Sequence, residues 1–148
     1  MPILKICCGV SGSGKTTWAE SLGVEWYNIN RDNHRFKLFC DGKHDWSLYK
    51  FTKERENQVT SRCNDDFNWA VHRELNIVVS NTNLNQKDIT YWQEKAESVG
   101  YEFEVKYFPI TFEDALKRDS KRGALAVGRE ILIQQWHKWL VISDYKTY

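Results

Sequence analysis

Residues 9–16 of the chain read Gly-Val-Ser-Gly-Ser-Gly-Lys-Thr, a full match to the pattern G-x-x-x-x-G-K-[ST]. The flanking residues suit a phosphate-binding loop, or P-loop. Ile3–Cys8 is an apolar run of strand length, and Thr16–Leu22 can continue as a helix. The glycines let the backbone turn tightly and bring its N–H groups up to phosphate oxygens. The stretch therefore predicts a strand, a loop and a helix that bind a nucleoside triphosphate; the alternative is an ordinary Gly-rich turn before a helix.

Two residues of the loop have chemical tasks of their own. Lys15 can place a point charge on the outer phosphates of ATP, and the Thr16 hydroxyl can ligate Mg²⁺. We expect Lys15 to face solvent, so that its removal would leave the fold intact. The residues predicted to bind ATP in this stretch are Gly9, Ser11, Gly12, Ser13, Gly14, Lys15, Thr16 and Thr17.

The length and composition are those of one globular domain, residues 1–148. A formal net charge of +1 gives no global field that would attract nucleic acid, so a site for a polyanion has to be a local patch. The four cysteines form no C-x-x-C pair, so no zinc site is expected, and free thiols fit a reducing, cytoplasmic location. No apolar run approaches the length of a membrane span, so no membrane association is expected.

Strand-like and helix-like segments alternate along the chain, which favours a parallel sheet covered by helices. The predicted fold class is therefore α/β: a P-loop domain with a four-stranded parallel sheet flanked by helices. The Trp-rich last helix could supply an interface for a homo-oligomer. The predicted strands are Ile3–Cys8, Glu25–Ile29, Asn76–Ser80 and Glu102–Phe108, and the predicted helices are Thr16–Leu22, Gln58–Leu75, Asn85–Val99, Thr111–Lys117 and Arg129–Val141.

A carboxylate follows the second predicted strand. Ligands of open parallel sheets bind beyond the carboxyl ends of the strands, so Asp32, at the end of a strand beside the first, would stand across the γ-phosphate from the P-loop. There it can accept a proton from an attacking hydroxyl, as the base of a kinase does. The alternative is that Asp32 caps the helical run after it. Arg35, one turn on, either holds an acceptor phosphate or is a surface arginine.

Two asparagines follow the third predicted strand. Many P-loop proteins have an Asp here that supports magnesium, whereas this chain has Asn81. The amides of Asn81 and Asn83 can still donate and accept hydrogen bonds toward an acceptor substrate.

A basic stretch, residues 117–123, lies between two predicted helices. Arg118 and Arg122 are four apart and would share one face of a helix, so both could converge on the phosphates of ATP as a lid. The alternative is a solvated helix end, which is the usual role of such a charge run.

Taken together in order and spacing, these segments resemble the kinase domain of the bacteriophage polynucleotide kinases. Members of that family transfer the γ-phosphate of ATP to the 5′-hydroxyl of DNA or RNA in nucleic acid repair. The resemblance spans nearly the whole chain, and its combined motifs are more specific than the P-loop alone. The segments that carry it are Gly9–Trp18, Tyr27–Arg35, Tyr49–Lys53, Asn81–Asn85, Lys117–Gly123 and residues 126–127.

The resemblance implies a role for each matching residue. Lys15 and Thr16 would serve the phosphates and magnesium, and Asp32 would be the general base. Arg35 would hold the phosphate 3′ to the acceptor nucleotide, and Arg122, with Arg118, would belong to the lid over ATP. The partner would be the 5′-hydroxyl end of DNA or RNA, in the host cytoplasm if the chain is phage-encoded.

The chain departs from the family pattern in two places. The family has an Asp where Asn81 stands, and that Asp is thought to hold the acceptor-binding arginine. With Asn81 the hydrogen bond is kept but the charge pair is lost, so we expect no charged partner for Arg35. The larger family enzymes also carry a D-x-D-x-T motif in a phosphatase domain, which this sequence lacks, so no 3′-phosphatase activity is expected.

Two other functions stay open at this point. One is a small-molecule kinase of the gluconate or shikimate type, which shares a P-loop, an acidic residue after the second strand and an Arg-bearing lid. The other is a nucleotide-dependent binding module without catalysis, which would leave Asp32 and the Arg118/Arg122 pair without a task.

Overall fold

The computed structural model of the chain describes the backbone of residues 1–146 and the side chains of residues 1–143. It contains a four-stranded sheet with the order β2-β3-β1-β4, in which every neighbouring pair is parallel. The predicted α/β fold is therefore confirmed. The strands are β1 (Ile3–Cys8), β2 (Trp26–Ile29), β3 (Asn76–Val79) and β4 (Glu102–Tyr107).

The position of the second strand differs from the prediction. We expected β2 beside β1, but β3 lies between them and pairs with both. The short α1 therefore belongs to a connection that skips one place in the sheet. As a result, the loop after β3 lies between the P-loop and the start of α2.

Five helices lie where they were predicted, with differences at their ends, whereas α2 was expected only as a helical run after Asp32. The longest begins at Lys53 rather than Gln58, because the Thr52 side chain accepts a hydrogen bond from the Arg55 N–H and caps it there. The helices are α1 (Lys15–Glu20), α2 (Arg31–Phe39), α3 (Lys53–His72), α4 (Gln86–Ser98), α5 (Phe112–Ser120) and α6 (Arg129–Lys146), and two single 3₁₀ turns are η1 (Trp46–Leu48) and η2 (Gly123–Leu125).

The two faces of the sheet are covered unequally. On one face, Leu4 and Ile6 of β1 pack in the main core with apolar side chains of α3, α4 and α6. On the other face, Cys7 and Val78 pack in a small cluster with Ala19 of α1, Leu22 and a few partly buried aromatic residues. Alternate residues of the buried central strand therefore serve different cores, as the two-residue period of a strand requires.

The tryptophans of α6 face inward rather than outward. Trp139 is buried in the main core against Tyr107, and Trp136 packs on Phe112 of α5. Folding therefore uses the surface of Trp139 and part of the surface of Trp136. The exposed apolar side chains of α6 include Leu140 and Val141, and a homo-oligomer stays a prediction.

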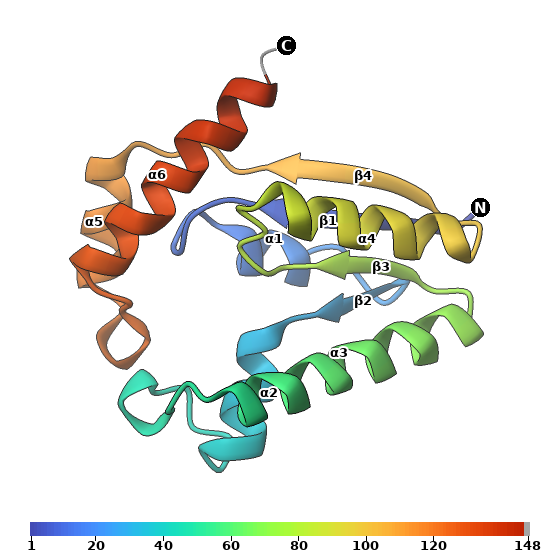
Figure 1. Cartoon of the computed structure of the whole chain (residues 1–148), viewed down its shortest axis with the longest axis horizontal. Coiled ribbons are helices and arrows are strands. Elements are labelled where there is room, and N and C mark those ends of the chain that lie inside the picture. The colour runs from blue at the N-terminus through green and yellow to red at the C-terminus, as the bar shows by residue number, and fades with distance from the viewer. Residues whose placement is uncertain (147–148) are drawn as a thin grey trace.

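All four strands point toward the same end of the molecule, where α5, α6 and the turn after α2 gather around the loops (Figure 1). This arrangement brings the segments after β1, β2 and β3 to one edge of the sheet. Among the helices that the structure describes, none has the length and apolar character needed to cross a membrane.

Gly9 is held where no side chain fits. A Cβ atom at this position would lie 2.9 Å from Cβ of Phe108 and 2.7 Å from Oγ of Ser13. We therefore expect Gly9→Ala to lower the free energy of unfolding by about 1–3 kcal/mol, because one of these neighbours has to move. Denaturant unfolding measures this change, with Val24→Ala at a fully exposed position as the control. An unchanged midpoint for Gly9→Ala would contradict the close packing.

Candidate active site

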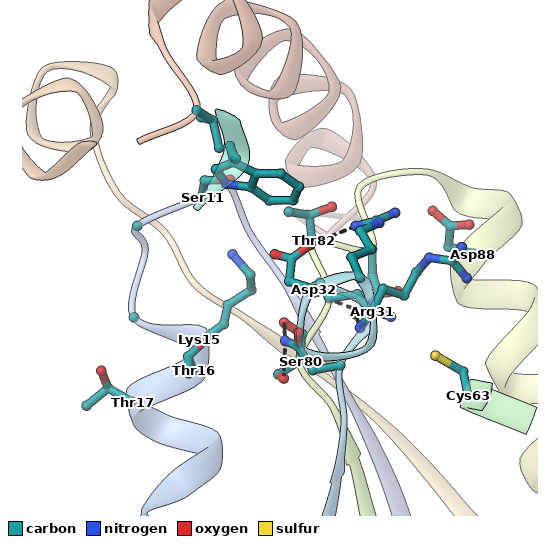
Figure 2. Close-up of a pocket in the computed structure, with 18 of the residues that line it drawn as sticks. Ser11, Lys15, Thr16, Thr17, Arg31, Asp32, Cys63, Ser80, Thr82 and Asp88 are labelled. Carbon is teal, nitrogen blue, oxygen red and sulfur yellow. Dashed lines mark hydrogen bonds and ion pairs between the residues drawn. The ribbon is translucent and has the colours of Figure 1, made fainter. Parts of the chain in front are cut away.

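A cavity of about 670 Å³ opens at the carboxyl end of the sheet. Figure 2 shows Lys15 reaching into it from the P-loop side and Asp32 from the side of α2. Gly9, which packs on Phe108, and Ser13 do not line it. The predicted site residues that do line it are Ser11, Gly12, Gly14, Lys15, Thr16, Thr17, Asp32, Arg35, Asn81, Asn83, Arg118 and Arg122.

Lys15 is more enclosed than expected. The prediction that it faces solvent is wrong: only 7% of the residue is exposed, and its ammonium donates a 2.6 Å hydrogen bond to the Val10 carbonyl across the loop. Burial lowers the pKa of Lys15 to about 8, with a further lowering by the nearby charge of Arg122. The ammonium is thus poorly solvated, which makes an anionic phosphate group a strong partner for it.

This environment predicts a pH-dependent affinity for ATP. In the free protein Lys15 loses its proton as the pH rises through about 8, whereas bound phosphate favours the charged form and raises the pKa again. ATP binding should therefore take up a proton. The Kd should rise by up to about tenfold per pH unit above 8, where phosphate groups are already ionised. Calorimetric titration in buffers of different ionisation enthalpy measures this proton uptake. Lys15→Met should bind ATP weakly with no such pH dependence, and an equal dependence in that variant would assign the proton to another group.

Thr16 is suited to hold a magnesium ion. It follows Lys15 in the first turn of α1, is exposed, and lines the cavity. Mg²⁺ keeps several of its waters and binds through one or two protein oxygens together with substrate phosphates, so this small donor set fits the ion. The described residues contain no cluster of three or more acidic, His or Cys side chains that could hold a metal ion alone.

The start of α2 is capped by asparagines and not by Asp32. The Asn30 side chain accepts from the Asn33 N–H, and Asn81 Oδ1 accepts from the Arg31 N–H at 2.8 Å. The alternative that Asp32 is the cap is therefore wrong. Asp32 lies in the first helical turn instead, with 48% of its side chain exposed toward the cavity.

Arg35 has two charged partners, contrary to our expectation of none. Its Nε and Nη2 donate to the two carboxylate oxygens of Glu56 at 3.0 and 2.6 Å, and its Nη1 donates to Asp32 Oδ1 at 2.7 Å. Glu56 also accepts from the Tyr49 hydroxyl at 2.7 Å. Burial alone would raise the pKa of Glu56, but the bonds from Arg35 and Tyr49 lower it to about 2. Arg35 is thus held in place by α3, and Asn81 is not needed for this.

Asn83 is tied to the backbone. It is buried, has a φ of 48°, and its amide nitrogen donates to the Cys7 carbonyl at 2.8 Å. This bond connects the loop after β3 to the end of β1. A contact from Asn83 to the acceptor stays a prediction, and the amide nitrogen is not free to make it.

The two arginines predicted to form a lid reach the cavity from different positions. α5 ends at Ser120, so Arg118 and Arg122 do not share a helix face as predicted. Arg118 donates to the Gly12 carbonyl at 3.0 Å, and its Cβ would lie 3.6 Å from a Cβ atom placed on Gly12 of the P-loop. Arg122 lies beyond the helix end, where its Nη1 is buried and has no hydrogen-bond partner among the residues that the structure describes. A buried donor of a charged group is costly unless it is paired, so this guanidinium is suited to bind an anion.

A buried carboxylate closes the loop that carries Arg122. Asp119 is 4% exposed, and its two oxygens accept from the N–H groups of Val127 and Gly128 at 2.9 and 3.0 Å. It thereby joins the end of α5 to the start of α6 and fixes the loop in between. Its position inside the basic stretch is the only sequence signal it gives.

We expect Asp119→Ala to free this loop and lower kcat by about tenfold to a hundredfold, because Arg122 loses its fixed position. The Kd for ATP should change less than kcat. Asp114→Ala, an exposed carboxylate of the same helix, is the control and should leave both values unchanged. Wild-type turnover by a folded Asp119→Ala protein would show that the loop needs no such closure.

A family model matches most of the chain. The model described as an AAA domain matches residues 4–139. The chain is also 34% identical, over 152 aligned positions, to the "Putative bifunctional polynucleotide kinase/RNA ligase" of Autographa californica nuclear polyhedrosis virus. That alignment covers 98% of this chain but only 22% of the viral protein.

Solved structures show the same fold. A chain of the Pnkp1/Rnl/Hen1 RNA repair complex matches 97% of this chain and 46% of its own length, with a TM-score of 0.76 and 20% identity. The Mycobacterium tuberculosis APS kinase CysC, in complex with AMPPNP and APS, matches 81% of this chain and 69% of its own length, with a TM-score of 0.60 and 18% identity. At these identities the likeness concerns the fold alone.

Proposed function

The chain belongs to the AAA domain family, and within it we propose that the chain is a kinase that transfers the γ-phosphate of ATP to the 5′-hydroxyl end of DNA or RNA. One observation carries the proposal: a single cavity brings Lys15 and Arg122, neither of which has an ion pair among the described residues, together with a carboxylate paired to an arginine. Lys15 and Arg122 suit the triphosphate, and Asp32 with Arg35 suits an acceptor that bears both a hydroxyl and a phosphate.

The chemistry assigns one task to each group. Asp32 accepts the proton of the 5′-hydroxyl as its oxygen attacks the γ-phosphorus and the bond to the β-phosphate oxygen breaks. Lys15 and Arg122 stabilise the charge on the phosphoryl oxygens, and bound Mg²⁺, held through Thr16, would neutralise further charge when present. The residues supply mainly position and charge, because phosphoryl transfer needs little covalent help from the protein.

The place of Arg35 distinguishes a polynucleotide from a small alcohol. Glu56 and Asp32 fix the guanidinium of Arg35. Its Nη1 donates a hydrogen bond directly to Asp32, the candidate base. A phosphate bound there lies close to the hydroxyl that Asp32 activates. A 5′-hydroxyl nucleotide with a 3′-phosphate has these two groups on one sugar, which a gluconate- or shikimate-type substrate does not.

A comparison of acceptors tests the proposal. With ATP and Mg²⁺, we expect turnover of a 5′-hydroxyl oligonucleotide and of adenosine 3′-monophosphate, and little turnover of adenosine. Arg35→Ala should mainly raise the KM for the acceptor, since the contact exists before the reaction. Turnover of gluconate, shikimate or adenosine 5′-phosphosulfate, with none of the oligonucleotide, would replace the proposal by a small-molecule kinase. ATP binding without transfer to any acceptor would favour a binding module.

A further inference from the structure

An exposed aromatic side chain lies next to the acceptor side of the cavity. Phe51 is 60% exposed, so much of its side chain is open to solvent. Trp46 of η1 lies nearly parallel to it, with ring centroids 5.8 Å apart and an interplanar angle of 17°. Tyr49 meets the Phe51 ring edge-on and is itself buried, so the two outer rings are held on a fixed base. We call Trp46 and Phe51 together the aromatic platform.

The platform is continuous with the proposed acceptor site. A second cavity of about 300 Å³ is lined by both platform residues and also by Asp32 and Arg35, which line the first cavity as well. The guanidinium carbon of Arg35 lies 5.3 Å from the centre of the Phe51 ring. A phosphate on Arg35 would therefore lie next to the platform.

From this arrangement we infer that the aromatic platform stacks the base of the second nucleotide of the acceptor strand. The inference rests on the proposed function. The phosphate that Arg35 would hold is 3′ to the first nucleotide, and the same phosphate carries the second nucleoside. That nucleoside begins beside Phe51, and its base is the group within reach of the exposed ring surface.

The chemistry of the platform specifies the class of acceptor. Aromatic rings bind any base by its face, so this contact tolerates all sequences. Stacking on the platform requires a base that is not paired and stacked in a duplex, which favours a single-stranded 5′ end over a blunt duplex. Lys50 and Lys53 are exposed on either side of Phe51 in sequence and add positive charge near the backbone of such a strand.

The test compares acceptors that differ only beyond the first nucleotide. We expect the wild-type KM for a 5′-hydroxyl dinucleotide to be about tenfold lower than for the matching nucleoside 3′-monophosphate, the low end for one base on an aromatic ring. A dinucleotide with an abasic second position should behave like the monophosphate. Equal KM values for the intact and the abasic dinucleotide would overturn the inference and leave the proposed function standing. Failure of all three to be phosphorylated would overturn both.

Two variants locate the contact. Phe51→Leu should raise the KM for the dinucleotide about tenfold and leave the KM for the monophosphate and for ATP unchanged. Phe51→Leu should not raise the KM for the abasic dinucleotide, because this acceptor already lacks the base that Phe51 would contact. Trp69→Leu is the matched control, since Trp69 is also exposed and packed against an arginine but lines neither cavity. If Phe51→Leu impaired the monophosphate and the dinucleotide equally, Phe51 would only be orienting Arg35.

Discussion

Replacing Arg122 by alanine is expected to lower kcat by about a thousandfold or more, with a much smaller effect on the KM for the oligonucleotide. The reason is the Nη1 atom, which is buried at the cavity and has no acceptor within the described part of the chain. Its partner in our account is the phosphoryl group, whose charge is spread over the oxygens in the transition state. Steady-state kinetics with saturating ATP and a 5′-hydroxyl oligonucleotide measure the two constants separately.

Two further variants make the result specific to this side chain. Arg122→Lys should recover only part of the activity, because an ammonium lacks the planar fork of a guanidinium. Lys121→Ala removes an exposed charge from the adjacent position and should have little effect. If Arg122→Ala turned over at the wild-type rate, the loop after α5 would be a solvated helix end after all.

Asp32→Asn is expected to lower kcat by about 10²–10⁴ while ATP affinity changes little. The substitution keeps an oxygen that can accept from Arg35 but removes the capacity to take up a proton. Stability should be nearly unchanged, because Asn30 and Asn81 cap α2 and Asp32 does not. Kinetics, a thermal melt and ATP titration of the same preparation separate these effects.

Asp65→Asn is a suitable control for the loss of a carboxylate, since Asp65 is exposed on α3. It should match the wild type in all three measurements. A folded Asp32→Asn protein with wild-type kcat would remove Asp32 as the base, and the proton would then go to solvent or to another group.

Sequence reasoning reached the parts of the site that are encoded locally. The strand, loop and helix at residues 3–20 follow from one continuous pattern, because backbone turns and helix starts are decided by neighbouring residues. The alternation of strand-like and helix-like segments was sufficient to predict a parallel α/β sheet. It did not predict the order of the strands, because no feature of the β3 sequence indicates that β3 lies between β1 and β2.

The contacts that sequence reasoning missed join distant segments. Glu56 is separated from Arg35 by the whole of η1 and its flanking turns, and it comes from a helix whose start we placed too late. The enclosure of Lys15 depends on a bond across the loop, and its burial on the surrounding elements. Asp119 gave only a weak signal, since it is a lone acidic residue in a basic stretch. Its role depends on residues 127 and 128 returning to the end of α5, which the sequence alone does not reveal.

The central claim is that one cavity holds the triphosphate and a nucleic-acid end with Asp32 between them. The most direct test is a crystal structure of the protein with Mg²⁺, a non-hydrolysable ATP analogue and a 5′-hydroxyl dinucleotide. We predict the terminal phosphate at Lys15 and Arg122, the 5′-oxygen within hydrogen-bond distance of Asp32, and the 3′-phosphate on Arg35. A dinucleotide bound elsewhere, with its 5′-oxygen remote from both Asp32 and the terminal phosphate, would contradict the account.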